Sequence, residues 1–113
     1  MRNTLKTLFF TFIFSLLFYS PVNAQAESLT QERKVELKNL LVQDCGSCHG
    51  MTMKGGLGPA LTPDVLASKS RQMIEITITH GRPGTPMPPW NTILTKQDIN
   101  WIVDTLYAGI KHE

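Results

Sequence analysis

Cys45-Gly46-Ser47-Cys48-His49 is the stretch that decides how this chain is expected to fold. Two thiols three positions apart, followed at once by a histidine, are the attachment signature of a c-type haem. The two cysteines would form thioethers with two vinyl groups on one edge of the porphyrin. His49, fixed next to Cys48, would then lie under the iron as an axial ligand.

A C-x-x-C motif also occurs in redox-active disulfides of the thioredoxin kind and in half of a zinc site. A zinc site needs four ligands, and His80 and His112 stand far along the chain without a second cysteine pair. A thioredoxin-like domain needs a βαβ pattern around the motif, which the sequence lacks. The motif holds the only two cysteines of the chain. We therefore predict one covalently attached haem c.

Residues 1–24 have the pattern of a secretory signal peptide, in which a short positive region precedes an apolar run. Cleavage is expected after Ala24, or alternatively after Ala26, which leaves 25–113 as one small cytochrome c domain. The apolar run at residues 8–19 is 12 residues long, whereas a membrane span needs about 20. We expect a periplasmic protein that is not inserted in the membrane after processing.

The formal net charge of +2 comes from the predicted signal peptide. Without Arg2 and Lys6, nine Lys and Arg residues balance nine Asp and Glu residues. A nucleic-acid binder would show a clear basic excess, so we expect no nucleic-acid partner. A chain this short buries limited apolar surface, and the haem is expected to supply much of the core.

Hydrophobic spacing predicts helices at both ends of the domain. The first is expected over about 30–43, opened by a weak capping box from Ser28 to Gln31, and runs directly into the haem motif. The last helix has clearer signals, because Thr95 and Asp98 form a capping box and a glycine ends it. Its apolar residues fall within an arc of about 100°, the width of a core-facing stripe; they are Ile99, Ile102, Val103, Leu106 and Ile110.

The middle of the chain is expected to hold two further helices. The first begins at Pro63 and continues to about Ala67. Residues 70–80 alternate like a strand but also place apolar residues on one helical face. Because no second strand is available to pair with them, we predict a helix that ends at Gly81. The glycines and prolines of the other segments predict loops.

The second axial ligand decides what such a haem can do. The candidates are Met51, Met53, Met73, Met87, His80 and His112. The two methionines nearest the motif stand too close to His49 for the chain to pass round the macrocycle. Met73 falls in a helix and is interpreted as a core residue, since methionine is a common gap filler.

Met87 lies 38 residues past His49, among four prolines that would hold its thioether in place. His80 is the competing ligand. Histidine and methionine together raise the reduction potential relative to harder donors, because soft sulfur favours ferrous iron. They also leave no open coordination position, which predicts an electron-transfer protein and not an enzyme. A small peroxidase or gas-binding haem protein would need Met87 to be absent or labile.

These residues resemble the class I cytochromes c, monohaem proteins with three to five helices folded round the haem. The resemblance covers nearly all of the mature chain and rests on the haem motif, Gly58-Pro59, the proline-flanked Met87 and the last helix. It implies that the Pro59 carbonyl accepts a hydrogen bond from the other ring nitrogen of His49 and orients it. It also implies that the first and last helices cross near an aromatic residue, here Tyr107.

Two longer strings, MTMKGGLGPALT at 51–62 and GRPGTPMPPW at 81–90, are similar to cytochrome c55x. That small periplasmic cytochrome is associated with cd1-type nitrite reductase in denitrifying bacteria. The resemblance implies a monomeric one-electron carrier that takes electrons from an upstream donor and passes them to nitrite reductase. The alternative it implies is an accessory redox factor in maturation of haem d1. Arg82 and Trp90 are candidate propionate contacts by position.

Overall fold

The computed structural model describes residues 28–111, and every regular element in that range is a helix, as predicted. The ambiguous stretch forms α5 (Arg71–His80), which ends at Gly81 with φ of 66°. No helix within the described range is long and apolar enough to cross a bilayer. The predicted signal peptide with its cleavage sites, and His112, lie outside the described residues.

The first helix is longer than predicted and runs through the haem motif itself. It consists of α2 (Gln31–Leu40), a π-helical turn η2 (Leu41–Cys45) and α3 (Gly46–His49). The predicted capping box at Ser28 is wrong, because the cap is Thr30, whose Oγ1 accepts the Arg33 N–H at 3.2 Å. Both residues carry the hydroxyl that a helix cap needs, so the local pattern did not separate them.

The π-helical turn lies directly before the second half of the motif, where the Gly46 N–H donates to the Leu41 carbonyl. Single π turns place one more residue in a helical turn and occur frequently at functional sites. The extra residue shifts the angular position of all later side chains around the helix axis. Leu37 before the π-helical turn and Leu41 at its start are fully buried, whereas Cys45 at its end is only half-buried.

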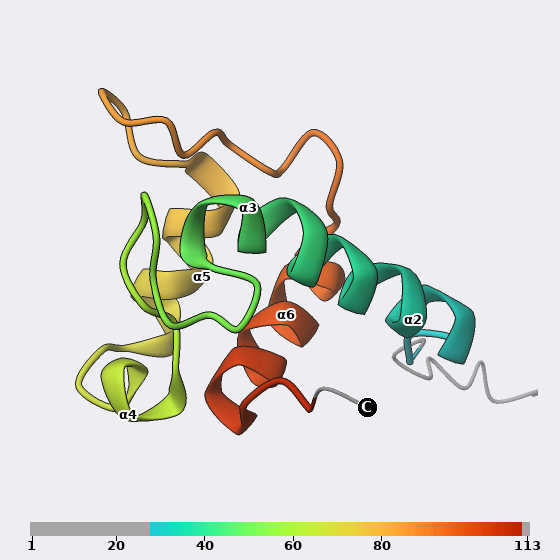
Figure 1. Ribbon diagram of the computed structural model, residues 1–113. Helices are drawn as coiled ribbons and strands as arrows, with labels where there is room; N and C mark the ends of the chain where they lie inside the picture. The colour runs from blue at the N-terminus through green and yellow to red at the C-terminus, as the bar shows by residue number, and fades with distance from the viewer. Residues whose placement is uncertain (1–27, 112–113) are drawn as a thin grey trace, which may run out of the picture.

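The last helix, α6 (Lys96–Ala108), packs against α2, α4 and α5 and forms the centre of the fold. Its predicted capping box is present between Thr95 and Asp98. In Figure 1 it passes behind the long first helix, with α4 (Pro63–Leu66) and α5 to one side. The core takes residues from every helix except the short α3, and comprises Leu37, Leu41, Met53, Leu66, Ile74, Ile78, Leu94, Ile99, Ile102, Val103 and Leu106.

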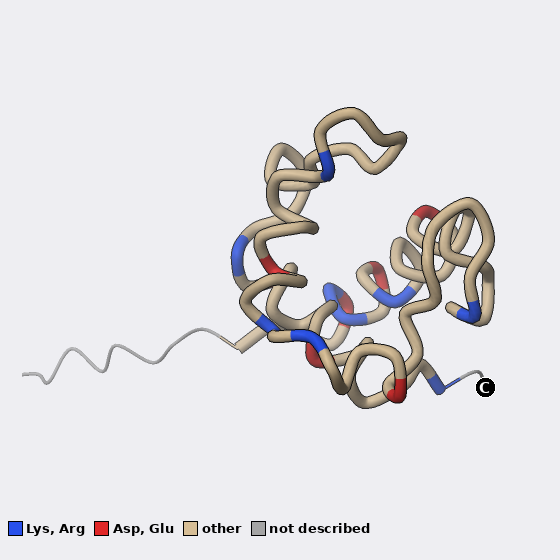
Figure 2. Tube along the Cα trace, turned by 90° about the vertical axis from the view of Figure 1, so that its left-hand side faces the viewer, with Lys and Arg blue, Asp and Glu red and all other residues tan. Residues whose placement is uncertain are grey.

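Charged residues of both signs are interspersed along the described trace (Figure 2). Two ion pairs join α6 to other helices, Arg33 with Asp98 and Arg71 with Asp104. Tyr107, the aromatic residue expected at the helix crossing, donates its hydroxyl hydrogen to the Lys69 carbonyl at 2.8 Å. The Arg71 guanidinium lies 5.2 Å from the ring centroid of Tyr107. Tyr107 therefore fastens α6 to the start of α5.

The interpretation of Met73 as a core residue is wrong, since its side chain is 43% exposed. On α5 the core is contacted by Ile74 and Ile78, and Met73 lies on a neighbouring face of the helix. The methionine that fills the core is Met53, which is 3% exposed. Trp101, opposite the apolar stripe of α6, is half-buried and packs against the core.

Candidate haem site

The first helix presents the cysteines and the histidine of the motif from its last two turns. Cys45 is the final residue of η2, and Cys48 and His49 lie in α3. Both cysteines are half-buried free thiols. Residues three apart on a helix lie on the same face, so both sulfur atoms can reach one edge of a flat ligand.

The ring of His49 is held by one hydrogen bond, in which Nδ1 lies 2.7 Å from the carbonyl oxygen of Pro59. This is the contact that the resemblance implies. Because a carbonyl oxygen can only accept, Nδ1 carries the hydrogen and Nε2 keeps its lone pair. A histidine fixed in this way through one nitrogen is oriented to bind a metal ion through the other.

The glycine-rich loop folds back over the end of α3. The Gly55 N–H donates to the His49 carbonyl and the Gly58 N–H to the Cys48 carbonyl, both at 2.8 Å, which satisfies carbonyls that a helix end leaves unpaired. A Cβ atom at Gly58 would lie 2.7 Å from Cε1 of the His49 ring. The loop therefore needs glycine here to let its backbone lie against the imidazole.

Replacing Gly58 with alanine is expected to displace either the His49 ring or the loop. The ring is held by Pro59, so the clash cannot be relieved by a free rotation, and overpacking of this kind costs about 1–3 kcal/mol. We expect less haem per protein and a lower melting temperature for the purified protein. Leu57→Ala is the matched control, because Leu57 is 89% exposed. Wild-type haem content and melting temperature in Gly58→Ala would contradict this account.

Met87 lies in the predicted proline-rich loop, drawn in orange above α3 and α5 in Figure 1. The Trp90 N–H donates to the Ile78 carbonyl at 3.1 Å, which fastens the far end of this loop to α5. Gly81 closes its near end, where a Cβ atom would lie 2.6 Å from the Met87 carbonyl oxygen. Met87 and Trp90 are half-buried and pack against the same core as Cys45.

The other candidate ligands are placed differently. Met53 is packed into the core, and Met51 is 49% exposed, with its sulfur beside Gly46. His80 is exposed at the C-terminal end of α5. Arg82 is exposed and Trp90 is half-buried, and their contacts with haem propionates stay predictions.

The thiol of Cys45 is unlike that of a redox-active C-x-x-C pair. Burial, and then the neighbouring Asp44 carboxylate, raise its pKa to about 11, so Cys45 is a neutral thiol at pH 7. Redox-active pairs of the thioredoxin kind need a thiol with a lowered pKa.

As for the zinc alternative, residues 28–111 contain no group of three His, Cys, Asp or Glu side chains that could hold a metal ion.

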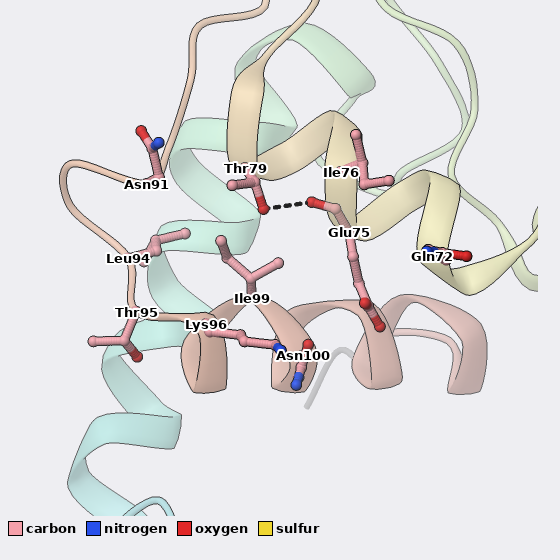
Figure 3. Close-up of a pocket in the computed structure, with 10 residues that line it drawn as sticks. All are labelled: Gln72, Glu75, Ile76, Thr79, Asn91, Leu94, Thr95, Lys96, Ile99 and Asn100. Atoms are coloured by element: carbon pink, nitrogen blue, oxygen red, sulfur yellow. Dashed lines mark hydrogen bonds between the residues drawn. The ribbon is translucent and has the colours of Figure 1, made fainter.

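A separate open cavity of about 500 Å³ lies between α5 and the first half of α6 (Figure 3). Leu94 and Ile99 contribute apolar surface to it, and Glu75 and Lys96 contribute charge. None of the residues that the sequence predicts to bind haem lines this cavity.

The described residues fit a covalently bound haem. The helix end offers two free thiols on one face, and His49 presents one imidazole nitrogen. Because Gly58 has no side chain, the backbone of its loop can lie against the His49 ring. Met87 carries a thioether in a segment with four prolines, and its role as the second ligand stays a prediction. One residue of this loop, Thr85, was not singled out by the sequence analysis, although threonine in a turn often bonds the backbone two residues on.

The helical fold and this set of residues define a small c-type cytochrome of class I. The family model described as cytochrome C oxidase, cbb3-type, subunit III matches residues 33–104. The chain is 56% identical over 86 residues to cytochrome c55X of Stutzerimonas stutzeri, which covers 76% of each chain. It therefore belongs to the cytochrome c55X family.

Two further similarities extend this result. The solved structure of the c-type cytochrome NirC is 50% identical and superposes with a TM-score of 0.69, covering 71% of this chain and 94% of that chain. The dihydro-heme d1 dehydrogenase of Pseudomonas aeruginosa is 37% identical over 86 residues, which is 76% of this chain but 17% of that enzyme.

Proposed function

We propose that this protein is a periplasmic, monomeric electron carrier with one covalently attached haem c, and that it donates electrons to cd1-type nitrite reductase. The observation that carries the proposal is the bond from His49 Nδ1 to the Pro59 carbonyl, which leaves Nε2 for the iron. Cys45 and Cys48 would hold the haem through thioethers, and Met87 would be the second ligand. When bound, the haem supplies an iron that changes its oxidation state by one electron.

The link to nitrite reductase comes from the resemblance stated above, in which cytochrome c55x is associated with that enzyme, and the 56% identity to cytochrome c55X of Stutzerimonas stutzeri supports the resemblance. Electron carriers of this kind use a small, transient docking surface, so that partners bind and separate quickly. We expect an upstream donor to use the same mode of contact. The signal-peptide pattern supports export, which suits a protein whose haem is attached outside the cytoplasm.

Rapid mixing of the reduced protein with oxidised cd1-type nitrite reductase tests the donor role. We expect the spectrum of the c-type haem to change to that of the oxidised form while the enzyme becomes reduced. The second-order rate constant should be about 10⁵–10⁷ M⁻¹s⁻¹. Enzyme that is already reduced is the control and should leave the spectrum unchanged. Transfer several orders of magnitude slower would contradict the proposal.

A second candidate is an accessory redox factor in maturation of haem d1. It is supported by the 37% identity to dihydro-heme d1 dehydrogenase. Nitrite reductase isolated from a strain that lacks this protein separates the two roles. Enzyme without haem d1 would favour the maturation role, and enzyme with its full complement would favour the donor role.

Carbon monoxide binding to the reduced protein at neutral pH would indicate instead a gas-binding protein or small peroxidase.

A further inference from the structure

The residues from Arg82 to Met87 form a turn that is closed by its own hydrogen bonds. The Arg82 carbonyl accepts the Thr85 N–H at 3.0 Å and the Thr85 hydroxyl at 2.7 Å. The Arg82 N–H donates to the Met87 carbonyl at 3.1 Å. The start and the end of the turn are therefore held together beside Gly81.

The hydroxyl of Thr85 bonds Met87 as well, since it accepts the Met87 N–H at 3.3 Å. Both backbone polar groups of Met87 are thus tied back into the turn, one through Arg82 and the other through a side chain. The Thr85 hydroxyl is the side-chain group that joins Arg82 to Met87.

The prolines of this segment cannot close the turn in the way that the Thr85 hydroxyl does. A proline ring fixes its own φ and restricts the residue before it, but it has no N–H to donate. Pro86 and Pro88 therefore limit the paths open to Met87 without closing the turn. Closure depends on donors and acceptors from the other residues, and the Thr85 hydroxyl supplies one of each.

We propose that Thr85 is a positioning residue for the Met87 thioether, whose hydroxyl keeps the sulfur in place when the iron is oxidised. This inference rests on the proposed function, because it takes Met87 as the axial ligand. Thioether sulfur is a weak ligand for ferric iron, so the backbone that carries it decides how often the sulfur leaves. Thr85 acts through Met87 and does not bind the iron.

Imidazole added to the oxidised holoprotein measures how often Met87 leaves, because it can bind the iron only when the sulfur has moved away. Thr85→Val keeps the shape of the side chain and removes the hydroxyl. We expect it to raise the apparent affinity for imidazole roughly three- to tenfold, the effect of losing the two exposed hydrogen bonds of the hydroxyl, to Arg82 and to Met87.

Three further variants make the experiment selective. Thr85→Ser keeps the hydroxyl and should restore an affinity close to that of the wild type. Thr92→Val, at an exposed threonine in the same connection, should leave the affinity unchanged. Met87→Ala should lose the band altogether. Unfolding by denaturant, followed for each variant, separates a local opening of the turn from a general loss of stability.

If Thr85→Val binds imidazole like the wild-type protein while Met87→Ala loses the band, the positioning role is overturned and the proposed ligand stands. The positioning role is overturned equally if Thr85→Val lowers global stability without changing imidazole affinity. If Met87→Ala keeps the band, both the ligand assignment and this inference fail.

Discussion

Replacing Met87 with alanine is expected to abolish the sulfur-to-iron absorption band of the oxidised protein and to lower its reduction potential. Soft thioether sulfur favours ferrous iron, so a harder replacement such as water stabilises the ferric state. Axial ligands vary haem potentials over about 0.8 V, and we expect a fall on the order of 0.2 V. Visible spectra and a potentiometric titration of the two purified proteins measure both effects.

Two variants serve as controls for this result. Met73→Ala removes another partly exposed thioether, and His80→Ala removes the competing ligand. Both proteins should keep the band and a potential near that of the wild type. A sulfur-to-iron band that survives in Met87→Ala but is lost in Met73→Ala would show that the second ligand has been assigned to the wrong residue. A wild-type protein without the band, whose potential changes in His80→Ala and not in Met87→Ala, would show the same.

The features that could be predicted from the sequence depend on neighbours along the chain. The capping box of Thr95 and Asp98 spans four residues, and the haem motif spans five, so each can be recognised within one short stretch of sequence. The helical state of 70–80 followed from the lack of a partner strand. Met87 stood out because prolines surround it, although the sequence could not show how the turn is closed through Thr85.

Other features that were missed depend on contacts between distant segments. Whether Met53 or Met73 fills the core is decided by how the loop and α5 pack, and the periodicity of a single helix does not contain that information. Asp98 was predicted as a helix cap, but its second partner is Arg33, 65 residues earlier in the chain. The hydrogen bond between His49 and Pro59 was predicted from the resemblance to a known family. The spacing of the two residues alone could not predict it.

Replacing Asp98 with alanine is expected to lower the free energy of unfolding of the holoprotein by about 3 kcal/mol. The carboxylate is 1% exposed, accepts Arg33 Nε at 3.0 Å and Nη2 at 2.9 Å, and accepts the Thr95 N–H at 2.9 Å. Loss of its half of the capping box, the hydrogen bond from the Thr95 N–H, costs about 1 kcal/mol. Breaking a buried ion pair costs 3–5 kcal/mol, and less here because Arg33 can turn to water.

For a domain of this size, that loss corresponds to a fall in melting temperature of roughly 12–24 °C. Glu36→Gln is the matched control, because Glu36 pairs with the same guanidinium but its side chain is 65% exposed. Exposed pairs contribute little, so this variant should melt close to the wild type. Equal falls in melting temperature for the two variants would contradict this account. They would show that the buried pair of Asp98 and Arg33 stabilises the protein no more than the exposed pair does.

The charge of Asp98 also makes stability depend on pH in a definite direction. Its hydrogen bonds with Arg33 lower its pKa in the folded protein to about 2, against about 3.9 in an unfolded chain. Because the folded value is the lower one, the stabilisation is complete above about pH 5 and is lost as the pH falls towards 2. The difference in free energy of unfolding between the wild-type protein and Asp98→Asn should therefore fall by about 2 kcal/mol across that range. Denaturant unfolding at pH 4.5 and pH 2 measures this change, and a constant difference would show that the carboxylate is not held as an anion by Arg33.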